Sequence, residues 1–121
     1  MNYPDINNRE KGDEGEEIAV AFLESAGYSI LVRNFRVTRG EIDIIAEDQS
    51  RTLVFIEVKS VRDLRFGHPF SKITYGKQKT IAAVARQYLA VNKITNRPCR
   101  FDAIGIIAGK VEHLKNAFIM M

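Results

Sequence analysis

Cysteine and histidine, which supply the sulfur and imidazole ligands of many metal sites, are scarce in this chain. Its 121 residues contain one cysteine, Cys99, and two histidines, His68 and His113. A single cysteine excludes a disulfide within the chain, and these three side chains are too few for a Cys/His zinc cluster. Any metal site must therefore be built mainly from carboxylates, which favour Mg²⁺ or Mn²⁺.

Long apolar runs are also missing. No segment approaches the roughly 18 apolar residues that a membrane-spanning helix requires. The first segment, Met1–Asp13, is polar and acidic, unlike the apolar centre of a signal peptide. The sequence therefore predicts a cytoplasmic protein without a membrane partner.

The net charge is modest, but the two signs are unevenly distributed. The chain carries +3 overall, from 18 Lys and Arg against 15 Asp and Glu. Residues 1–24 hold seven acids against two cations, whereas residues 59–79 hold six cations against one acid. This asymmetry predicts one surface that faces a polyanion such as a nucleic acid.

The apolar pattern predicts the order helix, three strands, helix and strand. A first helix begins near Asp13 and ends at Gly27, and a second spans Thr74–Asn92. Strands are predicted at 28–35, 40–46, 53–59 and 99–107, with a short last one at 111–114. The first three pair antiparallel through short turns, and the second helix makes a crossover. We expect one α/β domain over residues 1–121, a mixed sheet flanked by helices, with residues 1–11 as a flexible lead-in.

Charged residues lie inside two central strands that are otherwise apolar enough to be buried. Burying an unpaired carboxylate costs several kcal/mol or more, so Asp43 and Glu57 each need a cation, a metal or a place at the rim of the sheet. A hairpin through the turn at 47–51 can bring Asp43 near Glu57 and Lys59. Two carboxylates and an ammonium group would form an oxygen-rich site for a divalent cation, with a lysine beside it.

Three further polar residues have open or structural interpretations. Glu16 lies on the apolar stripe of the first helix, where it either complements the helix dipole as a first-turn acid or belongs to the site. Asp102 lies inside a strand, where a hydrogen-bonded structural role is preferred over a ligand role. His113 is expected at the surface.

Eight basic residues are candidates for contacts with phosphates. Each alone is most simply a solvated cation, but as a group they predict a nucleic-acid surface. They are Arg33, Arg36, Arg39, Arg62, Arg65, Lys72, Lys77 and Lys79. Lys77 and Lys79 oppose the dipole at the start of the second helix, which a bound anion or solvent screening would relieve.

The irregular segment from Ser60 to Ile73 contains two phenylalanines among its basic residues. Phe66 and Phe70 could stack on unpaired bases, but packing against the core is the preferred interpretation because Phe is usually buried.

The sequence resembles the PD-(D/E)xK nuclease superfamily, whose signature of Asp, a gap and Glu-x-Lys is matched by Asp43 and Glu57-Val58-Lys59. It is more closely similar to the bacterial YraN family, which is similar in outline to archaeal Holliday junction resolvases. The matching residues cover nearly the whole chain. They are Gly12, Gly15-Glu16, Ala19, Gly27-Tyr28, Arg33-Asn34, Arg36, Gly40–Asp43, Phe55–Lys59, Arg100–Asp102 and Asn116–Phe118.

This resemblance implies a restriction-endonuclease-like fold and a metal-dependent endonuclease that hydrolyses DNA, with branched DNA as one candidate. Asp43 and Glu57 would bind Mg²⁺ or Mn²⁺, and Glu16 would reach it directly or through a water. Lys59 would orient the attacking water or neutralise the transition state. A resolvase-like reaction would further imply a homodimer with paired sites.

Two other functions stay open at this stage. The same fold and basic loop could form a nucleic-acid-binding module that has no catalytic activity. Alternatively, Asp43, Glu57 and Lys59 could form a structural ion network in an interaction protein.

Overall fold

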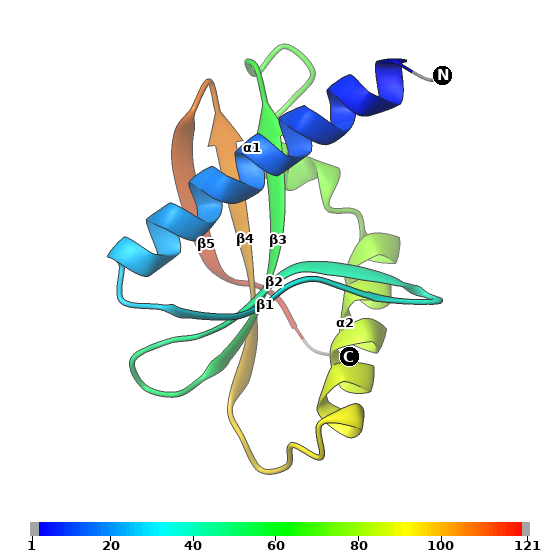
Figure 1. Cartoon of the computed structure of the whole chain (residues 1–121), viewed down its shortest axis with the longest axis vertical. Helices are drawn as coiled ribbons and strands as arrows, with labels where there is room; N and C mark the ends of the chain where they lie inside the picture. The colour runs from blue at the N-terminus through cyan, green and yellow to red at the C-terminus, as the bar shows by residue number, and fades with distance from the viewer. Residues whose placement is uncertain (1–2, 120–121) are drawn as a thin grey trace.

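The computed structural model of the chain describes residues 3–119, with side chains from residue 14 onward. Its elements are α1 (Tyr3–Ser25), β1 (Ser29–Val37), β2 (Gly40–Glu47), β3 (Leu53–Val61), the 3-10 helix η1 (Pro69–Lys72), α2 (Tyr75–Val91), β4 (Cys99–Ile107) and β5 (Lys110–Phe118) (Figure 1). The predicted α/β class and the order of elements are confirmed.

The bounds of several elements differ from the prediction. Helix α1 begins at Tyr3 rather than near Asp13, so the backbone of residues 3–11 is helical and only Met1 and Asn2 of the expected lead-in lie outside the described residues. Strand β5 extends to Phe118 rather than ending near Leu114. The irregular segment after β3 contains η1. Although α1 is long, no helix within residues 3–119 is both long and apolar enough to cross a membrane.

The five strands form one mixed sheet in the order β1-β2-β3-β4-β5. β1, β2 and β3 pair antiparallel, β3 and β4 pair parallel, and β4 and β5 pair antiparallel. The parallel pair follows from the crossover through η1 and α2. This crossover returns the chain to the end of the sheet where β3 begins, so that Cys99 lies beside Leu53. This arrangement is consistent with the expected restriction-endonuclease-like fold.

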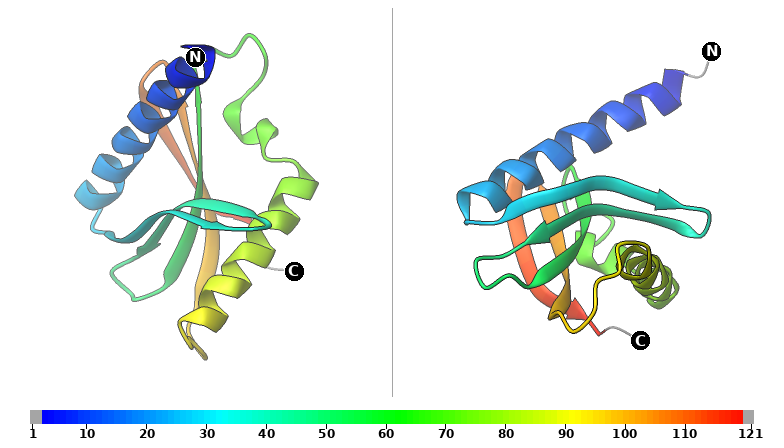
Figure 2. Two further views of the ribbon diagram at one scale, coloured as in Figure 1. Left: turned by 45° about the vertical axis from the view of Figure 1, so that its right-hand side comes forward. Right: turned by 60° about the horizontal axis from the view of Figure 1, so that its bottom comes forward.

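The two long helices cover opposite faces of the sheet (Figure 2). On β3 the side chains alternate, so that Phe55 packs in the cluster that contains α2 residues, whereas Val54 and Ile56 pack in the cluster that contains α1 residues. Burial on both faces explains why β3 has a nearly continuous apolar sequence.

β2 and β3 separate halfway along their length. Their pairing extends only from Glu47 opposite Leu53 to Ile44 opposite Ile56. Beyond this point β2 stays with β1 as a two-stranded hairpin that extends across the molecule toward α2 (Figures 1 and 2). The first residue of β2, Gly40, lies directly on α2, because a Cβ atom added there would be 2.8 Å from Thr80 Cγ2. The second half of β3 therefore has no pairing with β2 along this edge.

Candidate active site

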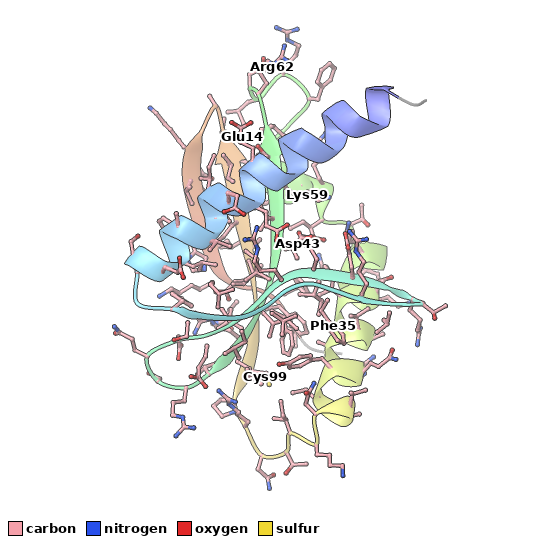
Figure 3. The ribbon with its side chains drawn as sticks, in the orientation of Figure 1. Glu14, Phe35, Asp43, Lys59, Arg62 and Cys99 are labelled. Atoms are coloured by element: carbon pink, nitrogen blue, oxygen red, sulfur yellow. The ribbon has the colours of Figure 1, made fainter. Side chains whose placement is uncertain are left out.

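Asp43 lies at the point where β2 leaves β3. Regular pairing ends at Ile44 and Ile56, and the backbone N–H of Val58 instead donates a hydrogen bond to Asp43 Oδ2 at 2.8 Å. The carboxylate therefore takes the place of the strand on this edge of β3. Figure 3 shows Asp43 near the middle of the sheet, with Lys59 close to it.

Glu57 brings a second carboxyl group to the same place. Its side chain follows Phe55 by two residues on β3, so it points toward α2, and it is only 5% exposed. Burial, followed by the neighbouring Glu57 carboxyl group, raises the pKa of Asp43 from 3.8 to about 8, while the charge of Lys59 opposes this rise. The predicted convergence of these three side chains is therefore observed.

Lys77, which is predicted above as a phosphate contact, supplies a cation to this pair. Thr74 caps α2 by accepting a hydrogen bond from the backbone N–H of Lys77 at 3.2 Å, and this first turn directs the lysine toward β3. Its Nζ lies 3.3 Å from Glu57 Oε2. Burial lowers the pKa of Lys77, but the charge and hydrogen bonding of Glu57, together with Lys59 and the charge of Asp43, outweigh burial, so the pKa is raised.

The contact with Glu57 explains why a lysine is tolerated in the first turn of α2. A cation at a helix N-terminus is unfavourable unless an anion is near, and the anion here is the buried carboxylate of Glu57. Lys77 thus belongs to the acidic pair rather than to a free basic surface. The unfavourable helix position was the only sequence signal of this role.

Glu16 is bound by Arg33 and Asn34 rather than grouped with that pair in the part of the chain whose side chains are described. It is in the interior of α1, so the first-turn interpretation is wrong, and it is 7% exposed. Its Oε1 accepts hydrogen bonds from Arg33 Nε at 2.9 Å and from Asn34 Nδ2 at 3.1 Å. Among the side chains described from residue 14 onward, no three His, Cys, Asp or Glu residues are grouped to hold a metal. A role for Glu16 in metal binding stays a prediction.

The acidic pair fits a divalent cation by its chemistry. Glu57 Oε2 is buried and has no hydrogen-bond partner, although the Lys77 ammonium group is nearby. Carboxylate oxygens are the ligands that Mg²⁺ and Mn²⁺ prefer. Asp43 and Glu57 are therefore the residues that would hold such an ion, and the ion would relieve the repulsion that raises the pKa of Asp43.

Several of the predicted phosphate-binding residues are engaged within the protein. Arg33 binds Glu16 and also Glu17, whose carboxylate lies 2.6 Å from Arg33 Nη2. Arg36 Nε donates to Glu41 at 2.7 Å, and Arg65 Nη2 lies 3.8 Å from Asp63. Because these ion pairs, apart from Glu16, are exposed, they contribute little to stability and can rearrange when a polyanion approaches.

The other predicted cations line cavities at the surface. Arg39 and Lys79 line one cavity together with Tyr75 and Arg86. Lys79 Nζ lies 5.4 Å from the centre of the Tyr75 ring, within range of a cation–π contact. Arg62, at the end of β3, lines a cavity of about 660 Å³ that also contains Lys59 (Figure 3). Lys72 donates to the Phe66 carbonyl at 3.0 Å.

The two phenylalanines of the loop behave differently. Phe70 packs against β4, since a Cβ added at Gly105 would lie 3.0 Å from Phe70 Cε1. Phe66 is 80% exposed, so the preferred packing interpretation is correct for Phe70 and wrong for Phe66.

Asp102 is fully buried in a network on the other side of the molecule. It accepts hydrogen bonds from Arg100 Nε at 3.0 Å and from the backbone N–H of Asn116 at 3.1 Å, and His113 Nε2 lies 2.8 Å away. Burial raises the pKa of Asp102, but its bonds to His113, Arg100 and the Asn116 backbone, together with the charge of Arg100, outweigh burial and lower the pKa. The structural interpretation of Asp102 agrees with this environment.

His113 is not a surface residue, so that expectation is wrong. Its ring packs edge-on against Phe22 of α1 and Tyr28, at centroid distances of 5.9 Å. Arg100 also binds Tyr28 and Asp48, at 2.6 and 2.7 Å. The network therefore connects β5, β4, α1 and the turn between β2 and β3.

Comparisons with known proteins identify the family. The sequence model of the uncharacterised protein family UPF0102 matches residues 15–106. A UPF0102 protein of Clostridioides difficile (strain 630) is 43% identical over 115 residues, which cover 93% of this chain and all of the relative. UPF0102 proteins of Geotalea daltonii and Chlorobium phaeobacteroides are 45% and 47% identical, covering 93% and 89% of this chain and 91% and 93% of the relatives, respectively. The chain therefore belongs to the UPF0102 family, which is the YraN family.

Proposed function

We propose that this protein is a metal-dependent endonuclease that hydrolyses phosphodiester bonds of DNA. The observation that carries the proposal is the pair of carboxyl groups of Asp43 and Glu57 where β2 leaves β3. Burial, together with the neighbouring Glu57 carboxyl group, raises the pKa of Asp43 to about 8, and Glu57 keeps a buried oxygen without a hydrogen-bond partner. Strong perturbation of a carboxyl group by burial and a like charge is typical of functional sites.

The side chains around the pair match the needs of phosphodiester hydrolysis. A divalent cation held by Asp43 and Glu57 would supply Lewis acidity for the phosphate and lower the pKa of water. The Lys59 ammonium group can orient the attacking water or offset the negative charge that develops on the phosphate. The Lys77 ammonium group lies 3.3 Å from Glu57 Oε2 and forms an ion pair that holds the Glu57 side chain in place.

Basic surfaces extend from the pair in two directions. On one side, Lys59 and Arg62 line the same cavity. On the other side, Lys77 lines a cavity with Gly76 and Thr80, both of which also line the cavity that contains Arg39 and Lys79. A nucleic-acid strand could therefore contact cations on both sides of the carboxyl groups, which favours a polyanionic substrate.

Cleavage assays with matched variants test the proposal. Wild type, Asp43→Asn, Glu57→Gln and Lys59→Met would be incubated with linear, flapped and four-way DNA in Mg²⁺ and in Mn²⁺. Glu24→Gln is the control, because Glu24 is an exposed acid near the C-terminal end of α1 and lines none of the cavities described above. We expect cleavage by wild type and Glu24→Gln alone. Equal cleavage by wild type and all three site variants would overturn the assignment.

A nucleic-acid-binding module without turnover is the second candidate. It is favoured by Lys77, because Glu57 already has a counterion within the chain and therefore does not require a metal. Calorimetry with Mn²⁺ separates the two functions. The nuclease predicts heat of binding that is lost in Asp43→Asn and Glu57→Gln, whereas the binding module predicts no heat that depends on either residue.

A further inference from the structure

Phe66 is the feature of the surface that the proposed chemistry leaves unexplained. Its side chain is 80% exposed, in the loop that follows β3. Exposure of a large aromatic ring to water is unfavourable, since burying such a side chain is worth about 1.5–3 kcal/mol. Phe70, four residues later, is packed against Gly105 of β4, so this loop has access to the core.

The loop holds Phe66 outward through defined hydrogen bonds. The backbone N–H of Gly67 donates to the Leu64 carbonyl at 3.0 Å, which closes a turn around Phe66. Lys72 Nζ donates to the Phe66 carbonyl at 3.0 Å, and His68 bonds to Glu112 of β5 at 2.6 Å. These three hydrogen bonds restrain the loop before and after Phe66, while its ring stays exposed.

Cations surround the ring and lead to the candidate active site. Phe66 lines a cavity together with Val61, Arg62, Arg65 and Lys72, and Asp63 is the one acid in that lining. Val61 and Arg62 also line the neighbouring cavity, which contains Lys59. Phe66 and Lys59 thus line neighbouring cavities, and Arg62 lines both of them.

We propose that Phe66 stacks on an unpaired nucleobase of the substrate strand while the surrounding cations contact its phosphates. The proposal rests on the proposed nuclease function and specifies the substrate class: a DNA with single-stranded bases close to the cleaved bond, such as a flap or a branch. The faces of bases inside a continuous duplex are covered by their neighbours, so only an unstacked base offers a face to an aromatic ring.

Binding measurements in EDTA separate this inference from cleavage. The affinities of wild type, Phe66→Ala and Phe66→Leu would be measured by fluorescence anisotropy for a flapped DNA and for a fully paired duplex of the same sequence. Leu64→Ala is the matched control, because Leu64 is an exposed apolar residue of the same loop, 55% exposed. We expect Phe66→Ala to weaken binding to the flap about 10-fold and leave duplex binding unchanged.

Phe66→Leu distinguishes stacking from simple apolar contact. Leucine keeps the apolar volume without the flat ring, so we expect the same loss as in Phe66→Ala, and no loss in Leu64→Ala. The chain contains no tryptophan, so F66W introduces a single indole whose fluorescence reports directly on contact with a base. We expect the flapped DNA to quench that fluorescence and the duplex to leave it unchanged.

The outcomes separate the two proposals. Equal losses of affinity for flap and duplex, full affinity in Phe66→Leu, or unchanged F66W fluorescence would overturn the role of Phe66, while cleavage by wild type would still support the nuclease. If wild type neither binds nor cuts any of these DNAs, the nuclease proposal and this inference are both overturned.

Discussion

The backbone N–H of Val58 donates to the carboxylate of Asp43 at 2.8 Å, in the place where a strand would otherwise continue the sheet. This one bond connects the fold to the proposed chemistry. It gives the backbone N–H of Val58 an acceptor at a point where β2 no longer pairs with β3, and it holds the Asp43 carboxyl group against Glu57. The repulsion between the two carboxyl groups therefore follows from the way the sheet opens.

The first prediction concerns how stability depends on pH without metal. The pKa of Asp43 is about 8 in the folded protein and 3.8 in the reference state. Between these values the folded protein keeps a proton that the unfolded chain releases, so raising the pH lowers stability, by up to about 1.4 kcal/mol per pH unit. Asp43→Asn keeps an oxygen acceptor for Val58 and removes the titration.

Urea unfolding of wild type and Asp43→Asn from pH 4 to pH 9 in EDTA measures this difference. We expect the stability of the variant relative to wild type to increase up to about pH 8 and then to level off. Titrating groups that do not interact with Asp43 are shared by both proteins and cancel in the comparison. Parallel stability curves across the whole range would contradict the raised pKa of Asp43.

The second prediction concerns Lys77. Lys77→Met removes the ammonium group 3.3 Å from Glu57 and so takes away the ion-pair partner of that buried side chain, with Lys59 as the cation that stays at the pair. Because the Lys77 side chain is 42% exposed, solvent reduces the effect, and we expect a loss of about 1–2 kcal/mol at pH 7. A divalent cation would replace the missing charge, so Mn²⁺ should stabilise Lys77→Met more than it stabilises wild type, as measured by thermal unfolding.

Lys79→Met is the control for this experiment. Lys79 is two residues further along α2 and lies over the Tyr75 ring rather than near Glu57. Its replacement should change stability by less than about 0.5 kcal/mol. Equal losses in both variants, or no additional stabilisation of Lys77→Met by Mn²⁺, would show that Lys77 does not serve the acidic pair.

The sequence was sufficient to bring Asp43, Glu57 and Lys59 together, because short-range rules determine that part of the site. Side chains alternate on strands, and a short turn makes neighbouring strands antiparallel. The role of Lys77 depends on how α2 packs against β3, which alternation along a strand does not determine. His113 was misplaced for the same reason, since its partner Asp102 lies on a neighbouring strand and its ring packs on α1.

Sequence patterns also do not predict the exposure of Phe66. Phe66 and Phe70 occur in the same irregular loop, and general burial preferences treat them alike. Phe70 lies within η1 and packs toward Gly105, whereas Phe66 lies in the turn that ends at Gly67 and points toward solvent. Such loop conformations are set by individual hydrogen bonds rather than by a repeating pattern.

The third prediction separates the buried network from the proposed site. Asp102→Ala removes the buried carboxylate that binds Arg100, His113 and the backbone N–H of Asn116, while Arg100 keeps its contacts with Asp48 and Tyr28. We expect a loss of about 3–5 kcal/mol in the free energy of unfolding, measured in urea at pH 7. The heat of Mn²⁺ binding per folded molecule should stay unchanged, because Asp102 is not among the residues that would hold the ion. Loss of that heat in a folded Asp102 variant would place Asp102 in the site.

The fourth prediction concerns the cavity formed by α2 and the β1–β2 turn. If Arg39 and Lys79, which line it, contact phosphates of the substrate, the double variant Arg39→Ala/Lys79→Ala should bind DNA more weakly in EDTA. Each lost phosphate contact should reduce the slope of log affinity against log salt concentration by about 0.9. The slope of the double variant should therefore be smaller by about 1.8, with a similar loss for flapped and paired DNA, since phosphate contacts do not depend on base pairing.

Lys115→Ala is a suitable control for this measurement, because Lys115 is an exposed cation on β5 that lines neither the cavity of Arg39 and Lys79 nor the cavity of Lys59 and Arg62. Its salt dependence should stay close to that of wild type. An unchanged slope in the double variant would exclude this cavity from the substrate path. The DNA strand would then contact the protein only from the carboxyl groups toward Arg62. The protein would bind its substrate on one side of the cleaved bond rather than on both.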